Sequence, residues 1–187
     1  DELQGTPLTM YLAHPERGSI HSYGMAVDLT LLDRVEQVSS EESIEMARRL
    51  MEEERPPKGD WDLKLAKGGL VDIEFIAQLL QIIHAPHGGP LEVNTAKALA
   101  TAKAGGLAGA DQIAALEAGW KLQQNLTQLL KVALDDDADP LLEPAPFRTL
   151  LAKAAGVRNF KSVPAYLALI RQSAREAFEQ IAKDLQR

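Results

Sequence analysis

The sequence predicts an all-α fold, a helical bundle of about six helices that follows an irregular N-terminal arm. Aromatic residues make up only 5% of the chain, while alanine and leucine are abundant, and this composition favours helices over a β-sandwich. Apolar residues also recur at helical spacing in several long segments, and glycine or proline separates these segments. With 187 residues the chain is large enough to bury a core as one domain.

The chain is predicted to have two parts. Residues 1–38 form the irregular arm, and residues 39–187 form the helical bundle domain. The arm contains scattered prolines and glycines and one β-prone run at 26–32. This pattern predicts an irregular segment with one strand.

Two helices are predicted in the first half of the bundle domain. The first begins at Ser39, where Glu42 completes a capping box, and it ends at Glu54 before two prolines. The second runs from Gly69 to about His84 and is apolar on most sides. Such a helix belongs in the centre of a domain.

One polar stripe interrupts this central helix. Glu74, Gln78 and Gln81 are four and three residues apart, so they share one face. Polar side chains on an otherwise buried helix must find partners or line a cavity. The stripe is therefore either an exposed edge of the bundle or the wall of a cleft.

Four more helices are predicted in the second half of the chain. Gly105 and Gly106 separate the first two of them, and an acidic loop with prolines precedes the third. Gly156 ends the third helix, and Pro164 suits the first turn of the last. The predicted segments are 93–104, 111–134 and 147–155, and a last one that begins at 162 or 163 and ends at 186.

Composition limits the class of protein. The chain has no cysteine, which excludes a disulfide framework and a thiolate metal site and fits a reducing, cytoplasmic compartment. A formal net charge of −7 argues against nucleic acid as the main partner. No segment reaches the apolar length of a membrane span, and the N-terminus lacks a secretory pattern, so no membrane partner is expected. A local basic patch at Lys58, Lys64 and Lys67 is still compatible with a nucleotide.

A basic lead and a glycine pair precede the central helix. The lead is predicted to be strand-like and contains Lys64 and Lys67, and Gly68 and Gly69 follow it. Two glycines before a helix let backbone N–H groups approach an anion closely, and a lysine can neutralise that anion. The segment is not a Walker loop, because the spacing to a Gly-Lys-Ser/Thr is absent.

Two carboxylates, Asp72 and Glu74, lie in the first turn and a half of the same helix. A helix N-terminus has free N–H donors and a partial positive charge, so it favours its own carboxylates or a bound phosphate. The segment is therefore either a self-capped, buried helix start or part of a polyanion site.

The same residues resemble the signature of the glutamine synthetase adenylyltransferases. In that family the signature opens the helical domain that follows each nucleotidyltransferase domain, and the form found here is more similar to the second, adenylylating half. From about Glu41 onward, the order of helices also resembles the end of those enzymes. The matching run is gapless and reads Lys64-x-x-Lys67-Gly68-Gly69-x-x-Asp72-Ile73-Glu74-Phe75-x-x-Gln78.

The resemblance implies a role in nucleotidyl transfer. The family transfers AMP from ATP to a tyrosine of glutamine synthetase, with Mg²⁺ held by aspartates of the nucleotidyltransferase domain. Those aspartates follow a glycine turn on a strand, in Asp-x-Asp order. Asp135-x-Asp137 and Asp137-x-Asp139 have the spacing here, but both follow a predicted helix and lack the glycine turn. The catalytic domain is therefore expected to be absent, and the chain alone would be inactive.

As an accessory domain, the chain would complete the nucleotide cleft and dock a partner. The implied partners are the nucleotidyltransferase domain, glutamine synthetase and the PII signalling protein, and ATP and Mg²⁺ are cofactors of the parent enzyme. No catalytic residue and no metal ligand is assigned. The nucleotide-binding or cleft-forming residues would be Lys64, Lys67, Gly68, Gly69, Asp72, Glu74 and Gln78.

Two alternative functions remain open. The run 18–30 resembles the Ser-x-His-x-x-Gly-x-Ala-x-Asp motif of zinc D-Ala-D-Ala dipeptidases, in which His21 and Asp28 would be zinc ligands. That family also needs a Glu-x-x-His, and this chain offers Gln81-x-x-His84, without the general base. The first alternative is therefore a remnant of such a peptidase. The second is a non-catalytic helical protein-interaction module.

Overall fold

The computed structural model describes residues 52–53, 56–89, 91–133 and 139–185. Within these ranges the ordered elements are helices and turns, and no strand occurs, which confirms the predicted all-α fold. The arm predicted at 1–38 lies outside the described residues, as does its predicted strand.

Five α-helices and two short 3₁₀ turns make up the described part of the bundle. The first helix predicted from the sequence is described only at Glu52 and Glu53, which are helical. No helix among the described residues combines the length and the apolar character that crossing a membrane requires. The elements are α3 (Leu70–His84), η3 (Ala85–His87), α4 (Thr95–Ala104), α5 (Ala110–Ala133), α6 (Ala145–Ala155), η4 (Phe160–Ser162) and α7 (Val163–Leu185).

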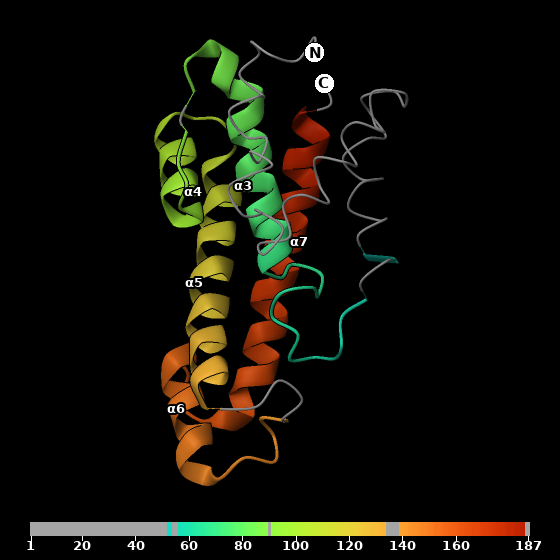
Figure 1. Cartoon of the computed structure of the whole chain (residues 1–187), viewed down its shortest axis with the longest axis vertical. Helices are drawn as coiled ribbons and strands as arrows, with labels where there is room; N and C mark the ends of the chain where they lie inside the picture. Colours follow the sequence, from blue (N-terminus) through green and yellow to red (C-terminus); the bar gives the residue numbers. More distant parts are fainter. Residues whose placement is uncertain (1–51, 54–55, 90, 134–138, 186–187) are drawn as a thin grey trace, which may run out of the picture.

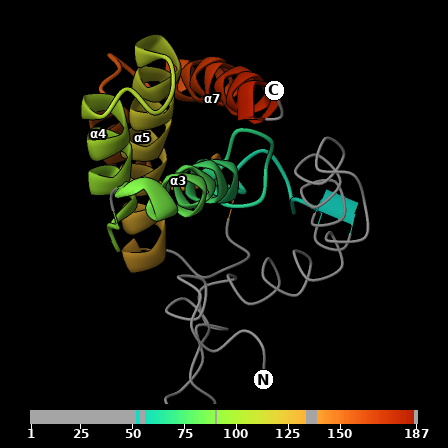
Figure 2. The ribbon, with the colours of Figure 1, turned by 90° about the horizontal axis from the view of Figure 1, so that it is seen from above.

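The long helices α5 and α7 lie side by side and run in opposite directions (Figure 1). Helix α3 packs against α4, α5 and α7 in one half of the bundle. Figure 2 shows α3 on one side of the α5–α7 pair, with α4 next to α3 and α5. Helix α6 lies at the opposite end of the bundle from α4, against α5 (Figure 1).

Two apolar clusters fill the bundle. The larger cluster lies among α3, α4, α5 and α7, as expected for a central α3, and its buried members include Ile73, Leu80, Leu99, Leu116 and Phe178. The smaller cluster lies among α6, the second half of α5, the start of α7 and the loop before α3. Its buried members include Leu63, Leu126, Leu151, Val163 and Leu167.

Helix α5 approaches its neighbours closely at Gly119. A Cβ atom at this position would lie 3.0 Å from Ile73 Cδ1 and 3.1 Å from the Cβ of Ala174. Helix α5 contributes Leu116 to the larger cluster and Leu122 to the smaller one. Gly119 therefore lies at the boundary between the two clusters, where α3, α5 and α7 meet.

Helix bounds differ from the sequence prediction by one or two residues, for local reasons. Helix α4 begins at Thr95 rather than at 93, because Asn94 Oδ1 accepts a hydrogen bond from the N–H of Lys97 at 3.1 Å. Helix α6 begins at Ala145 rather than at 147, because Pro146 is tolerated in a first turn.

The polar stripe of α3 is neither a plain edge nor a uniform cleft wall. Glu74 and Gln78 are half-buried, while Gln81 is only 7% exposed. The Oε1 atom of Gln81 accepts a hydrogen bond from the backbone N–H of Glu92. Gln81 thus fastens the segment before α4 to the end of α3.

Candidate functional site

The lead before α3 is a series of turns, so the prediction of a strand-like segment is wrong. The carboxylate of Asp62 determines this local structure. Its Oδ1 accepts hydrogen bonds from the N–H groups of Lys64 at 3.1 Å and Leu65 at 2.8 Å, and its Oδ2 accepts one from Lys58 at 3.1 Å. A short aspartate side chain that binds nearby backbone donors stabilises turns at the expense of strands.

These turns fold back over the start of α3 and use its backbone donors. The N–H of Gly69 donates to Ala66 O at 2.7 Å, and that of Leu70 donates to Leu63 O at 2.9 Å. The N–H of Val71 likewise donates to the carbonyl oxygen of Lys64 at 3.1 Å. Donors that a phosphate would need at a helix N-terminus are therefore already engaged inside the chain.

The carboxylate of Asp72 closes the same turn from within. Its Oδ2 accepts a hydrogen bond from the N–H of Gly68 at 2.7 Å, and the side chain is fully buried. Asp72 therefore binds the backbone of the turn that precedes the helix, while the N-cap residue Gly69 has no side-chain cap. A buried carboxylate needs hydrogen bonds and a counter-charge, and both are present here.

Gln123 of α5 joins the glycine turn to α7. It is fully buried at the boundary between the two apolar clusters, and its Nε2 donates to the carbonyl oxygen of Gly68 at 2.9 Å. Its Oε1 accepts a hydrogen bond from Arg171 Nε at 3.1 Å. Both ends of the amide are thus used, which fixes its orientation.

Arg171 of α7 extends this connection to the loop. Its Nη1 donates to Asp60 O at 2.7 Å, and its Nη2 donates to Asp62 O at 2.7 Å. Burial lowers the pKa of Arg171, and the charges of Asp62 and Asp60 oppose that shift. One guanidinium therefore holds the loop and Gln123 together.

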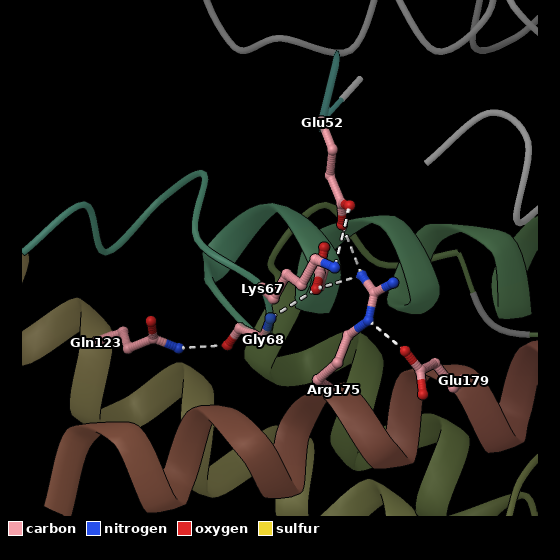
Figure 3. A network of polar contacts seen from close by, with 7 residues as sticks. Glu52, Lys67, Gly68, Gln123, Arg175 and Glu179 are labelled. Atoms are coloured by element: carbon pink, nitrogen blue, oxygen red, sulfur yellow. Dashed lines mark hydrogen bonds and ion pairs between the residues drawn. The ribbon is translucent and has the colours of Figure 1, made fainter. Parts of the chain in front are cut away.

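Arg175, one turn further along α7, contacts three carboxylates (Figure 3). Its Nη1 lies 2.9 Å from Glu52 Oε1 and 3.1 Å from Asp72 Oδ2, and its Nε lies 2.6 Å from Glu179 Oε1. Lys67 Nζ lies 3.8 Å from the other oxygen of Glu52. Burial lowers the pKa of Arg175, but the hydrogen bond to Glu179 and the charges of Asp72 and Glu52 outweigh this effect and raise it.

The structure divides the residues of the predicted cleft into two groups. Gly68, Gly69 and Asp72 are buried in the junction with α5 and α7. Lys64 and Lys67 are exposed. The outer group consists of these two lysines together with the half-buried Glu74 and Gln78.

The charge of Glu74 also interacts with a member of the outer group, Lys64. Burial raises the pKa of its carboxyl group above the ordinary value, and the positive charge of Lys64 partly opposes this. Glu74 and Lys64 thus interact with each other, whereas Asp72 interacts with α7.

Four residues of this junction were not among the predicted site residues: Asp62, Gln123, Arg171 and Arg175. A signal was available for the two arginines, which are four residues apart and therefore on one face of the last helix. Gln123 is a polar residue at the position of an apolar one on α5, one turn after Gly119. No spacing rule connects these positions to the loop, because the contacts join residues 48 to 111 positions apart.

No metal site emerges from the described residues. No group of three or more histidines and carboxylates there could hold a metal ion. His21 and Asp28, the zinc ligands of the peptidase hypothesis, and the Asp135-x-Asp137 pair lie outside the described residues.

Replacing Gln123 with leucine is expected to lower the free energy of unfolding by about 1–3 kcal/mol, because the carbonyl of Gly68 and the Nε of Arg171 lose a buried partner. Urea denaturation of both proteins measures the difference. Gln128→Leu, the same change at an exposed position of α5, is the matched control and should cost no more than about 0.5 kcal/mol. Equal losses in the two variants would contradict a structural role of the buried amide.

Most of the chain, including the turn before α3, matches a known protein family. The model described as GlnD PII-uridylyltransferase matches residues 41–187, a range that holds the whole motif but not His21 or Asp28. No solved structure matches the chain significantly.

Three curated relatives carry the name bifunctional glutamine synthetase adenylyltransferase/adenylyl-removing enzyme. The protein of Caulobacter vibrioides is 57% identical over 140 residues, which cover 75% of this chain and 14% of that protein. The protein of Xanthobacter autotrophicus is 40% identical over 126 residues (66% and 13%), and that of Rhizobium meliloti is 36% identical over 142 residues (74% and 14%).

The chain thus spans about one seventh of the length of these relatives, as the 14% coverage shows. The matched part includes the helical bundle and the turn before α3. The chain belongs to the family described as GlnD PII-uridylyltransferase, and its curated relatives are bifunctional glutamine synthetase adenylyltransferases.

Proposed function

We propose that this chain is the helical accessory domain of a glutamine synthetase adenylyltransferase, in which it supports transfer of AMP from ATP to a tyrosine of glutamine synthetase. The observation that carries the proposal is the set of hydrogen bonds and the ion pair that connect the turn before α3 to α5 and α7. Gln123, Arg171 and Arg175 hold this turn against α5 and α7, while Lys64 and Lys67 stay at the surface. A fixed loop with exposed ammonium groups is suited to complete a site on a neighbouring domain.

The proposed contact with ATP is made by side chains. The backbone N–H groups from Gly68 to Val71 are engaged within the chain, so they are not the donors for a phosphate. The ammonium groups of Lys64 and Lys67 are exposed and can neutralise phosphate charge at the edge of the nucleotidyltransferase domain. In this proposal Mg²⁺ is bound by carboxylates of the nucleotidyltransferase domain and by the phosphates of ATP.

Other partners follow from the same proposal. Glutamine synthetase would be the protein substrate, and the PII signalling protein would regulate the enzyme. A cytoplasmic location accords with a chain that has no cysteine.

The test is the double variant Lys64→Ala/Lys67→Ala in the full adenylyltransferase that contains this chain. The expected result is a decrease of about tenfold or more in kcat/KM for ATP, measured by AMP transfer to glutamine synthetase. Folding should be unaffected, because the only ion pair that either side chain makes among the described residues is the 3.8 Å contact of exposed Lys67 with Glu52.

Lys97→Ala/Lys121→Ala, two exposed lysines on α4 and α5, is the matched control. An unchanged kcat/KM for ATP in the motif variant, or an equal decrease in the control, would contradict the proposed contact.

A non-catalytic interaction module that binds no nucleotide is the second candidate. The observation in its favour is the internal use of the donors at the start of α3. Calorimetric titration of the full protein with ATP, in wild-type form and as the motif double variant, separates the candidates. Equal affinity in both proteins would favour the interaction module.

A further inference from the structure

One stretch of the chain has a charge opposite to that of the whole. Residues 144–175 contain no aspartate or glutamate, although the chain has 27 acidic residues and a net charge of −7. The same stretch forms α6, η4 and the first half of α7. Its six basic residues are Arg148, Lys153, Arg158, Lys161, Arg171 and Arg175.

Half of these basic residues have a structural role. Arg171 and Arg175 hold the turn before α3. The guanidinium of Arg148 lies 5.9 Å from the centroid of the Phe160 ring, which itself stacks on Trp61 at 6.0 Å. These three arginines are therefore accounted for by contacts within the bundle.

Lys153, Arg158 and Lys161 are different. All three are exposed, and none of them forms an ion pair with a described residue. They come from the last turn of α6, the loop that follows and η4. Because η4 packs against both α6 and α7, all three residues belong to elements at the end of the bundle where α6 lies, and the loop that leads into α6 there also carries Asp139 and Glu143.

Apolar side chains are exposed on the same elements. Leu150 is 51% exposed and lies three residues before Lys153, so the two share a face of α6. Tyr166 is 37% and Leu169 is 59% exposed, and they share a face of the first turns of α7. We name the six residues the α6–α7 surface: Leu150, Lys153, Arg158, Lys161, Tyr166 and Leu169.

We propose that the α6–α7 surface docks an acidic protein surface that presents apolar side chains among its carboxylates. Charge complementarity argues for carboxylates, since the three charged residues of the α6–α7 surface are all basic, on an acidic chain. The three exposed apolar residues argue for a protein rather than a nucleic acid, because a protein interface combines a hydrophobic centre with a polar rim. The chain as a whole would repel a polyanion.

The binding chemistry is tested first on the 187-residue chain itself. The probe is a synthetic peptide with glutamate and leucine side chains on one helical face, and its binding is measured by fluorescence anisotropy at low salt. The variant Lys153→Glu/Arg158→Glu/Lys161→Glu is expected to weaken binding about tenfold or more. The matched control Lys97→Glu/Lys121→Glu/Lys183→Glu, which changes the charge equally at exposed sites elsewhere, should not.

Each outcome of this measurement decides the proposal. Equal affinity in both variants, tighter binding of a DNA oligonucleotide of equal charge, or occupation of the surface by a second copy in sedimentation would overturn it. If the charge-reversal variant unfolds, Lys153→Gln/Arg158→Gln/Lys161→Gln replaces it, with an expected loss of about threefold or more.

The second measurement rests on the proposed function and identifies the partner as glutamine synthetase. In the full adenylyltransferase, the charge-reversal variant should raise KM for glutamine synthetase about tenfold and leave KM for ATP unchanged. An unchanged KM for glutamine synthetase would overturn this partner. If the wild-type enzyme transfers no AMP, the proposed function fails, and the peptide measurement still decides the surface.

Discussion

Replacing Gly68 with alanine is expected to lower the free energy of unfolding by about 3 kcal/mol or more, for two reasons that act together. Gly68 has a φ of +71°, a conformation that costs alanine about 1–2 kcal/mol. A Cβ atom there would also lie 1.9 Å from the carbonyl oxygen of Arg171, which belongs to the backbone of α7 and cannot rotate away. Urea denaturation followed by circular dichroism measures the loss.

Alanine variants at two other glycines separate the cost of the positive φ from the cost of the steric clash. Gly156 has the same φ of +71° but nothing within 4 Å of the added Cβ, so Gly156→Ala should cost only about 1–2 kcal/mol. Gly69 has an ordinary φ of −74°, but an added Cβ would lie 2.6 Å from Ala66 O. Gly69→Ala therefore isolates crowding, at about 1–3 kcal/mol. If Gly68→Ala cost no more than Gly156→Ala, the close contact with α7 would be contradicted.

This expectation changes how a loss of AMP transfer in a Gly68 variant should be interpreted. From the sequence, the glycine pair is a candidate for backbone contact with a phosphate. In the structure, Gly68 is the point at which the turn packs on α7, and its carbonyl and N–H bind Gln123 and Asp72. Inactivation by Gly68→Ala would therefore follow from a displaced turn, and the test of a phosphate contact has to use Lys64 and Lys67.

The fold was predictable from the sequence because helical periodicity and helix ends are local properties. The spacing of apolar residues located α3, α5 and α7, and a glycine such as Gly156 marked a helix end. Errors arose where a side chain acted on the backbone. Asp62 turned the predicted strand-like lead into turns, and Asn94 moved the start of α4.

The site was predictable only in part, because the residues that hold the motif in place come from distant positions in the sequence. The motif from Lys64 to Gln78 is one continuous run, so its residues could be named from the sequence. Gln123 and Arg171 reach the motif only after α5 and α7 have packed beside α3. Their polar character is required there because the glycine turn carries backbone groups into the boundary between two apolar clusters, and buried backbone groups need partners.

Replacing Arg175 with methionine is expected to cost about 3 kcal/mol or more, because it removes the guanidinium from a carboxylate that is fully buried. Methionine keeps an apolar stem that can pack near Phe178, over which the guanidinium now lies at 5.2 Å. Glu179→Gln is the matched control, since it alters only the exposed end of the same group and should cost about 0.5 kcal/mol or less. Urea denaturation at low and high salt measures both, and salt should remove only the effect of Glu179→Gln.

A double-mutant cycle assigns this loss to the buried pair. Asp72→Asn keeps an acceptor for the N–H of Gly68 but removes the charge that Arg175 faces. In the Asp72→Asn background there is no buried carboxylate, so Arg175→Met no longer leaves a negative charge without its guanidinium partner. The double variant should therefore lose less than the sum of the single variants, by about 1 kcal/mol or more. Additive losses would mean that Arg175 acts by packing alone, and the turn before α3 would then not depend on charge for its position on α7.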